Sequence, residues 1–227
     1  MRYYHYISDA KAEMLFAQIP PSFLSGLKVE LGFDFGVLKG KLAGEREAPA
    51  TRVARAEAVE RFLEKEASIE GSPIEHTWLR GKFPARIGFL TDCPGLVLFG
   101  GKYQDCTLIL AGSESHRLSG SANAGKDKGW SFMPRLLMGL RDYLDQNYDT
   151  LDLRTDNRLR PSEVANDYIF GGPVGSGGSM REALLTLPED SLPEPEIAVT
   201  FLCRVFYVVE NNLSEKLVLA SPLYVAQ

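Results

Sequence analysis

A segment rich in hydroxyl groups, with one imidazole, follows an apolar run at residues 108–111. It contains Ser113, Ser115 and His116, directly after Gly112. A serine becomes a nucleophile when an imidazole accepts its proton and a carboxylate orients that imidazole. The spacing therefore admits a hydrolase or transferase in which Ser113 or Ser115 acts with His116. The segment lacks the Gly-x-Ser-x-Gly turn that exposes a nucleophilic serine. A polar turn whose hydroxyls bond to backbone groups is therefore the preferred interpretation, and contact of Gly112 and Ser113 with a ligand is the next.

Asp9 is the carboxylate that can complete such a site, because it follows a predicted strand at residues 2–7. Ligands of α/β proteins bind beyond the carboxyl ends of strands, where Asp9 can act as a base or contact a ligand. Ser8 and Asp9 also suit a helix start, since short oxygen side chains accept the amide hydrogens of a first turn. Helix capping is the favoured interpretation of Asp9, and catalysis is the alternative.

A glycine-rich stretch at residues 171–179 is the second candidate site, and a predicted short helix follows it. Successive backbone amides in such a loop can surround an anion, and the helix N-terminus adds partial positive charge. Gly175, Gly177, Gly178 and Arg181 are therefore candidate ligand-binding residues. The stretch has neither the lysine of a phosphate-binding P-loop nor the spacing of a dinucleotide fingerprint. A flexible exposed loop is the favoured interpretation, and a site for a small anionic ligand, without a cofactor, is the alternative.

Metal and disulfide chemistry are not expected. The three histidines are isolated from one another, without the spacings typical of metal sites. The three cysteines, at positions 93, 106 and 203, form no Cys-x-x-Cys pair and are odd in number. Such scattered cysteines are usually buried and reduced, which predicts a cytoplasmic protein.

Periodicity predicts the elements that must position these residues. Amphipathic patterns predict helices over residues 10–19, 51–66 and 131–146. Alternating or apolar runs predict strands at 2–7, 27–38, 78–83, 86–91, 95–100, 105–112, 198–209 and 216–225. Helices with one apolar face need a sheet to cover. The sequence therefore predicts one α+β domain over residues 1–227, with mainly antiparallel sheet packed against about three helices.

Composition limits the class of partner. The 227 residues are 44% hydrophobic and carry a net charge of -5, which indicates a globular chain with a mildly acidic surface. A nucleic-acid partner is not predicted, because such binding needs many cationic contacts to phosphates. A membrane span is not predicted either, since no run approaches the ~20 apolar residues that it needs. The expected partner is a small anionic ligand or another protein.

Three motifs resemble an uncharacterised bacterial family that is best populated in actinobacteria. They are Arg-Tyr-Tyr-His-Tyr-Ile-Ser-Asp-Ala-Lys at 2–11, Leu-Ile-Leu-Ala-Gly-Ser at 108–113 and Ala-Ser-Pro-Leu-Tyr-Val-Ala at 220–226. The resemblance covers essentially the whole chain. It implies a bacterial cytoplasmic protein with a sensing or adaptor role in defence or signalling.

Three functions follow from these patterns. The preferred hypothesis is a non-enzymatic module for ligand sensing or protein interaction, because no catalytic constellation is recognisable. The first alternative is a hydrolase or transferase that uses Ser113 or Ser115 with His116. The second alternative is a structural adaptor that uses exposed strand edges and tyrosines. Convergence of Asp9, Ser113 and His116 in one pocket would favour the enzyme.

Overall fold

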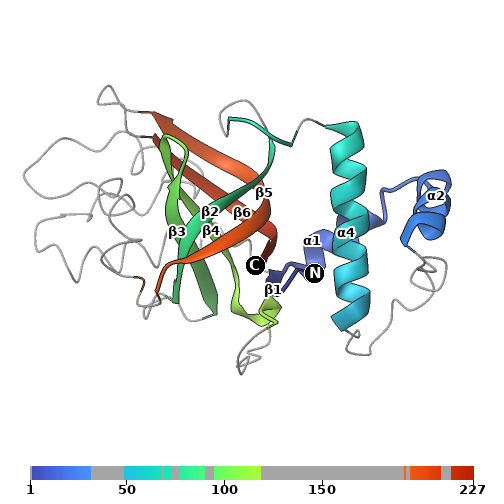
Figure 1. The fold of residues 1–227 in the computed structure, drawn as a ribbon, viewed down its shortest axis with the longest axis horizontal. Helices are drawn as coiled ribbons and strands as arrows, with labels where there is room; N and C mark the ends of the chain where they lie inside the picture. The colour runs from blue at the N-terminus through green and yellow to red at the C-terminus, as the bar shows by residue number, and fades with distance from the viewer. Residues whose placement is uncertain are drawn as a thin grey trace, which may run out of the picture.

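The protein consists of a β-barrel on one side and a layer of helices on the other, with both termini between them (Figure 1). This arrangement comes from a computed structural model. The structure describes residues 2–31, 49–67, 69–72, 77–89, 95–118, 192, 195–210 and 216–227. No helix in the described part of the chain combines the length and apolar character needed to cross a membrane.

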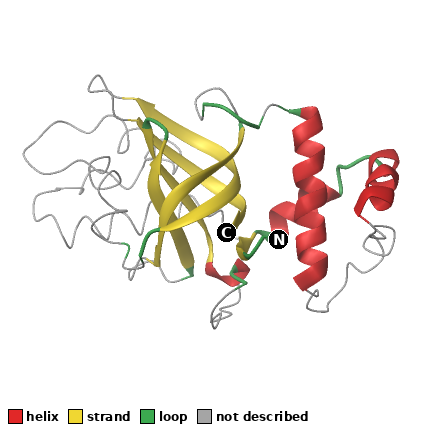
Figure 2. Cartoon of the chain, in the orientation of Figure 1, coloured by secondary structure: helices red, strands yellow, loops and turns green. Residues whose placement is uncertain are grey.

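The strands form one sheet in the order β1-β6-β4-β3-β2-β5, and a further pairing of β5 with β6 closes five of them into a barrel (Figure 2). Their bounds are Tyr4–Ile7 (β1), Trp78–Phe89 (β2), Leu96–Tyr103 (β3), Cys106–Ser113 (β4), Ile197–Glu210 (β5) and Lys216–Ala226 (β6). Every pairing is antiparallel except that of β4 with β6. Strand β1 lies outside the barrel and pairs with β6.

The pairing order places the barrel in a known architectural class. The five barrel strands are β2 to β6 in chain order. The first, β2, pairs with the second and fourth, β3 and β5, and the fifth, β6, pairs with the third and fourth, β4 and β5. With the third and fifth strands parallel, this is the pairing of the OB barrel, a five-stranded Greek-key barrel. OB barrels bind ligands on the face of their second and third strands, here β3 and β4. The outward side chains Leu98 and Ile109 on that face are completely buried, so this part of the face is closed to solvent.

The inward side chains of the barrel form one apolar core. They include Tyr6 from β1 and alternate residues of the barrel strands, such as Phe99, Leu108, Leu110 and Phe201. Because side chains of a strand alternate between its faces, the period-two runs of the sequence place these residues inside.

The helices pack on the opposite side of β1 and β6. Their bounds are Asp9–Phe16 (α1), Pro21–Leu31 (α2) and Pro49–Glu66 (α4). A second core joins the helices to the strands, with Phe16, Val59 and Leu63 facing Leu223 and Tyr224. The helices therefore owe their position to an apolar stripe that covers the outer surface of β1 and β6.

Most of the predicted elements are confirmed. The helices expected at 10–19 and 51–66 correspond to α1 and α4, and the last two strands correspond to β5 and β6. The meander of short strands is confirmed as β2, β3 and β4, which pair antiparallel in chain order. The α+β description holds, with the sheet closed into a barrel. The helix expected at 131–146 lies outside the described residues.

Two predictions of secondary structure are wrong. The segment expected as a strand at 27–38 is helical up to Leu31, within α2. Leu24 and Leu27 are buried with the spacing of one helix face, and this contact with the second core prevails over the alternation of a few residues. The separate strands expected at 78–83 and 86–91 form the single strand β2, which continues through Pro84.

Candidate functional site: the barrel-rim joint

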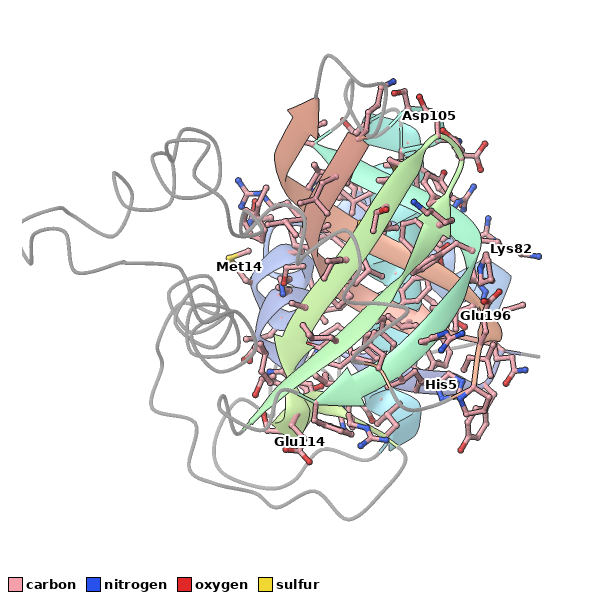
Figure 3. The ribbon with its side chains drawn as sticks, turned by 90° about the vertical axis from the view of Figure 1, so that its left-hand side faces the viewer. His5, Met14, Lys82, Asp105, Glu114 and Glu196 are labelled. Carbon is pink, nitrogen blue, oxygen red and sulfur yellow. The ribbon has the colours of Figure 1, made fainter. Side chains whose placement is uncertain are left out.

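One end of the barrel brings together residues from distant parts of the sequence. Strand β4 ends there at Ser113, and the short helix η1, Glu114–His116, follows directly. Tyr6 of β1 forms an isolated β-bridge with Arg117, the residue after η1. Strand β1 and the helix α1 that follows it therefore reach the same end of the barrel. Figure 3 shows Glu114 at this end of the barrel and Asp105 at the other. We call Asp9, Arg52, Ser113, Ser115 and His116 the rim joint.

Asp9 of α1 and Arg52 of α4 connect these two helices at the rim. The Arg52 Nε atom donates to the Asp9 carboxylate at 2.5 Å, and its terminal amine donates to the backbone oxygens of Ile7 and His116. A guanidinium suits this position because its planar set of donors serves several acceptors at once. Arg52 thus connects α4 to α1, β1 and η1.

His116 approaches the same carboxylate from the barrel side. Its Nδ1 atom lies 3.3 Å from Asp9 Oδ2. Burial acts to raise the pKa of Asp9, but the hydrogen bond with His116 and the positive charge of Arg52 outweigh burial and lower the pKa below its ordinary value. Asp9 is therefore a carboxylate near neutral pH and can orient the imidazole, as the acid of a catalytic triad does.

The two serines form a hydroxyl pair beside the imidazole in the sequence. Ser113 Oγ and Ser115 Oγ lie 2.9 Å apart, at the end of β4 and within η1. Gly112 has a packing role here, because a side chain at this position would collide with the ring and hydroxyl of Tyr6. Both serines are half-buried and hence within reach of solvent.

Two further side chains border the rim joint. The Arg117 guanidinium lies 4.8 Å from the ring centre of Phe89, at the end of β2. Phe89 is one of the few large apolar side chains exposed among the described residues. The rim therefore offers two guanidinium groups, one imidazole and two hydroxyls, balanced by the carboxylates of Asp9 and Glu114.

A different charged cluster joins α4 to the barrel away from the rim, and we call it the Glu60 joint. The Glu60 carboxylate accepts from Tyr224 at 2.7 Å, from Arg2 at 2.5 and 3.3 Å, and from Arg80 at 3.3 Å. Arg80 also pairs with Glu64 and Glu70. Burial acts to raise the pKa of Glu60, but these donors outweigh burial and lower it.

The structure brings together four of the predicted residues. Asp9, Ser113, Ser115 and His116 all lie at the rim, where His116 contacts Asp9 and the two serine hydroxyls contact each other. Arg52 was not identified from the sequence, because nothing local distinguishes it: its carboxylate partner lies 43 positions away.

The remaining predicted site residues cannot be placed. Gly175, Gly177, Gly178 and Arg181 lie outside the described residues. Among the residues that the structure does describe, no group of histidine, cysteine and acidic side chains could hold a metal ion. Cys106 and Cys203 are buried free thiols, and burial raises the pKa of Cys106 to about 11. Both are therefore poor nucleophiles.

Fold and site define an α+β protein in which a closed barrel and a helical layer meet at two charged joints. The chain belongs to a family of unknown function, DUF7019, whose family model matches residues 2–227. No curated protein and no solved structure matches the chain. The family thus accounts for almost the whole sequence, and any function must be argued from the geometry.

Proposed function

We propose that this protein is a non-enzymatic recognition module that senses a small anionic ligand at the rim joint. One observation carries the proposal: Arg52 and His116 hold the same carboxylate, that of Asp9, so that one residue joins the helices to the barrel. A ligand that bonds to His116 competes with Asp9 for a group that connects the two layers. Binding at the rim then changes how firmly the layers are joined, which is what a sensor requires.

The chemistry of the rim supports an anion. Arg52, Arg117 and His116 supply cationic or donor groups, and the mutually bonded hydroxyls of Ser113 and Ser115 add polar groups at the same rim. Charge-assisted hydrogen bonds to carboxylate or phosphate oxygens are the strongest that such groups form. The resemblance to bacterial sequences supports placing this sensor in the bacterial cytoplasm, within a defence or signalling system.

A thermal-shift screen tests the proposal. The panel contains inorganic phosphate, nucleoside monophosphates and small dicarboxylates, because a ligand that binds only the folded state raises the melting temperature. We expect at least one compound to stabilise the protein, and Ser113→Ala with Ser115→Ala to abolish that shift. The control is Ser25→Ala, an exposed serine on α2 whose hydroxyl bonds within its own helix. An equal shift in the serine variant would contradict binding at the rim.

A hydrolase or transferase is the second candidate function. The Asp9–His116 contact favours it, because an oriented imidazole is the general base that a serine nucleophile needs. The Arg52 ion pair weighs against it, since a carboxylate already held by a guanidinium stabilises an imidazolium less well.

A fluorophosphonate probe separates the two candidates, because it labels activated serines covalently. The recognition module predicts no labelling above that of Ser113→Ala and Ser115→Ala variants, measured by intact-protein mass spectrometry. Labelling that disappears in one of these variants and in His116→Ala would establish the enzyme and reject the proposed module.

A further inference from the structure

Helix α1 places a lysine against strand β6 at the point where β6 changes partners. The pairing of β6 with β4 ends at Ala220, and its pairing with β1 covers Tyr224 to Ala226. Between these pairings, the Lys11 ammonium donates to the backbone oxygen of Pro222 at 3.3 Å and to Ser8 Oγ at 3.4 Å. Lys11 therefore serves a backbone oxygen of β6 that lies between the two neighbouring strands.

The positive charge of Lys11 is not balanced by an acidic group. Burial is the main cause that lowers the pKa of Lys11 to about 8, and the positive charge of Arg204 on β5 lowers it further. In the part of the chain that the structure describes, no carboxylate bonds to Lys11 or contributes to its pKa. Asp9 is two positions away on α1, so it lies on a different side of the helix and binds Arg52 and His116. Lys11 is thus a largely buried cation, which is unfavourable without a negative partner.

A buried hydroxyl lies next to this cation. Ser221 directly precedes Pro222, is 1% exposed, and has no hydrogen-bond partner for its Oγ atom among the described residues. In the pairing of β5 with β6, Ser221 lies opposite Arg204, and Pro222 lies opposite Cys203. Since Cys203 faces the barrel core, Ser221 and Arg204 face outward, as Lys11 does from the helical side. Because a buried hydroxyl normally forms a hydrogen bond, Ser221 offers one donor to a ligand.

Arg204 adds donors on the solvent side of this group. Its side chain is exposed, and its guanidinium lies 5.7 Å from the ring centre of Phe206. A guanidinium over an aromatic ring keeps the N–H groups in its plane for an acceptor. We call Lys11, Ser221 and Arg204 the Lys11 cluster.

We propose that the Lys11 cluster binds a small inorganic oxyanion, of the size of phosphate or sulfate, between helix α1 and strands β5 and β6. Two cationic groups and one hydroxyl match the several oxygens of such an anion, and charge-assisted hydrogen bonds to it are strong. The anion balances the charge of Lys11 and holds α1 on the barrel. The site lies on another side of α1 than Asp9, and it does not depend on the function proposed for the rim joint.

Burial favours an ion of a few atoms over a larger ligand. Ser221 is buried and Lys11 is half-buried, whereas Arg204 is exposed. A ligand that reaches all three is enclosed by protein on the side of Ser221 and open to solvent on the side of Arg204. A nucleotide could insert only its phosphate group there.

Calorimetric titration with sodium sulfate tests the site. The titrations use the Ser113→Ala with Ser115→Ala protein, so that binding at the rim joint does not contribute, and chloride salt keeps the ionic strength constant. We expect one sulfate per chain at pH 7, similar binding of inorganic phosphate, and weaker binding of adenosine monophosphate. No binding of sulfate or phosphate, or tighter binding of the nucleotide, would overturn the proposal.

Substitutions locate the anion. Ser221→Ala is the most selective, because the hydroxyl that it removes has no bond to lose: affinity for sulfate should fall about fivefold while the melting temperature without sulfate stays the same. Lys11→Met should lower the affinity about tenfold or more. The charge-matched control, Lys82→Met at an exposed lysine of β2, should change it less than about twofold. An equal loss in this control, or unchanged affinity in Ser221→Ala and Lys11→Met, would reject the site.

The pH dependence of binding is a second test. The titratable groups that face Lys11 are Arg204 and Cys203 of β5, and burial raises the pKa of the Cys203 thiol above the range of the experiment. Between pH 7 and pH 10 only Lys11 among these groups changes its charge, and sulfate keeps the same charge throughout. Affinity should therefore fall towards that of Lys11→Met as the ammonium loses its proton, and the Lys11→Met protein should bind equally at each pH. An affinity that stays constant with Lys11 present would contradict the proposal.

Discussion

The Glu60 joint and the rim joint both tie helix α4 to the barrel, yet their surroundings differ. The Glu60 side chain is only 5% exposed, and its two oxygens accept hydrogen bonds from two arginines and a tyrosine. The Asp9 side chain is 38% exposed, and it is held by one arginine and one histidine. The Glu60 carboxylate is surrounded by donors and shielded from solvent, whereas the Asp9 carboxylate and its partner His116, whose side chain is 20% exposed, are open to solvent.

The interface between the helical layer and the barrel can therefore combine stability at one joint with recognition at the other. Removing a partner from a buried ion pair leaves an uncompensated charge and costs several kcal/mol, whereas exposed pairs contribute little. We infer that the Glu60 joint fixes the helical layer on the barrel and that the rim joint is the part that can change. Four predictions test this division, from the largest expected effect to the smallest.

The largest effect should follow from Glu60→Ala. Arg2 and the Tyr224 hydroxyl lose their carboxylate acceptor, and Arg80 loses one of its three. We expect a loss of about 3 kcal/mol in the free energy of unfolding. Urea titration monitored by circular dichroism measures it. The control, Glu66→Ala on the exposed face of α4, should change stability by less than about 0.5 kcal/mol. A loss of the same small size at Glu60 would remove the distinction between the joints.

Arg52→Ala should cost about 2 kcal/mol, less than Glu60→Ala, because the Asp9 carboxylate remains partly hydrated after the change. The same urea titration measures it, with Arg61→Ala as the exposed control. A double-mutant cycle with Asp9→Asn should give a coupling of more than about 0.5 kcal/mol. Additive effects would show that the Arg52–Asp9 contact does not hold the rim.

Lys11 gives a pH-dependent test of the packing of α1 against β6. Its ammonium donates to the Pro222 backbone oxygen at 3.3 Å, and burial lowers its pKa to about 8. The folded protein therefore binds fewer protons than the unfolded chain between pH 8 and the ordinary lysine pKa of about 10.4, and this group's contribution to stability rises with pH there.

The difference between the wild type and Lys11→Met isolates this contribution from tyrosines and cysteines that titrate in the same range. We expect the melting temperature of the wild type to rise relative to that of the variant between pH 8 and pH 10. A constant difference across this range would mean that Lys11 is not buried against β6.

Local patterns predicted most of the strands because their residues either alternate between apolar and polar or form a short continuous apolar run, as in β4. Closure of the barrel could not be predicted in the same way, since the pairing of β2 with β5 joins Trp78 to Arg204 across more than half of the sequence. Helix α2 was mistaken for a strand because Leu27, Val29 and Leu31 alternate over a short run.

The candidate site shows the same division between local and distant information. The hydroxyl and imidazole groups at 113–116 were recognisable from their types alone. Their association with Asp9, 107 positions from His116, and with Arg52 depends on how the helical layer packs against the barrel.

The most direct measurement of the rim's role is a nuclear magnetic resonance titration of the isotope-labelled protein with the same panel of anions. We predict that the amide resonances of Ser113, Ser115 and His116 shift with at least one anion. The double variant Ser113→Ala with Ser115→Ala should remove those shifts. It should change the free energy of unfolding by less than about 1 kcal/mol, the smallest change among these predictions. Shifts confined to residues outside the rim, or no shift with any anion of the panel, would contradict the account.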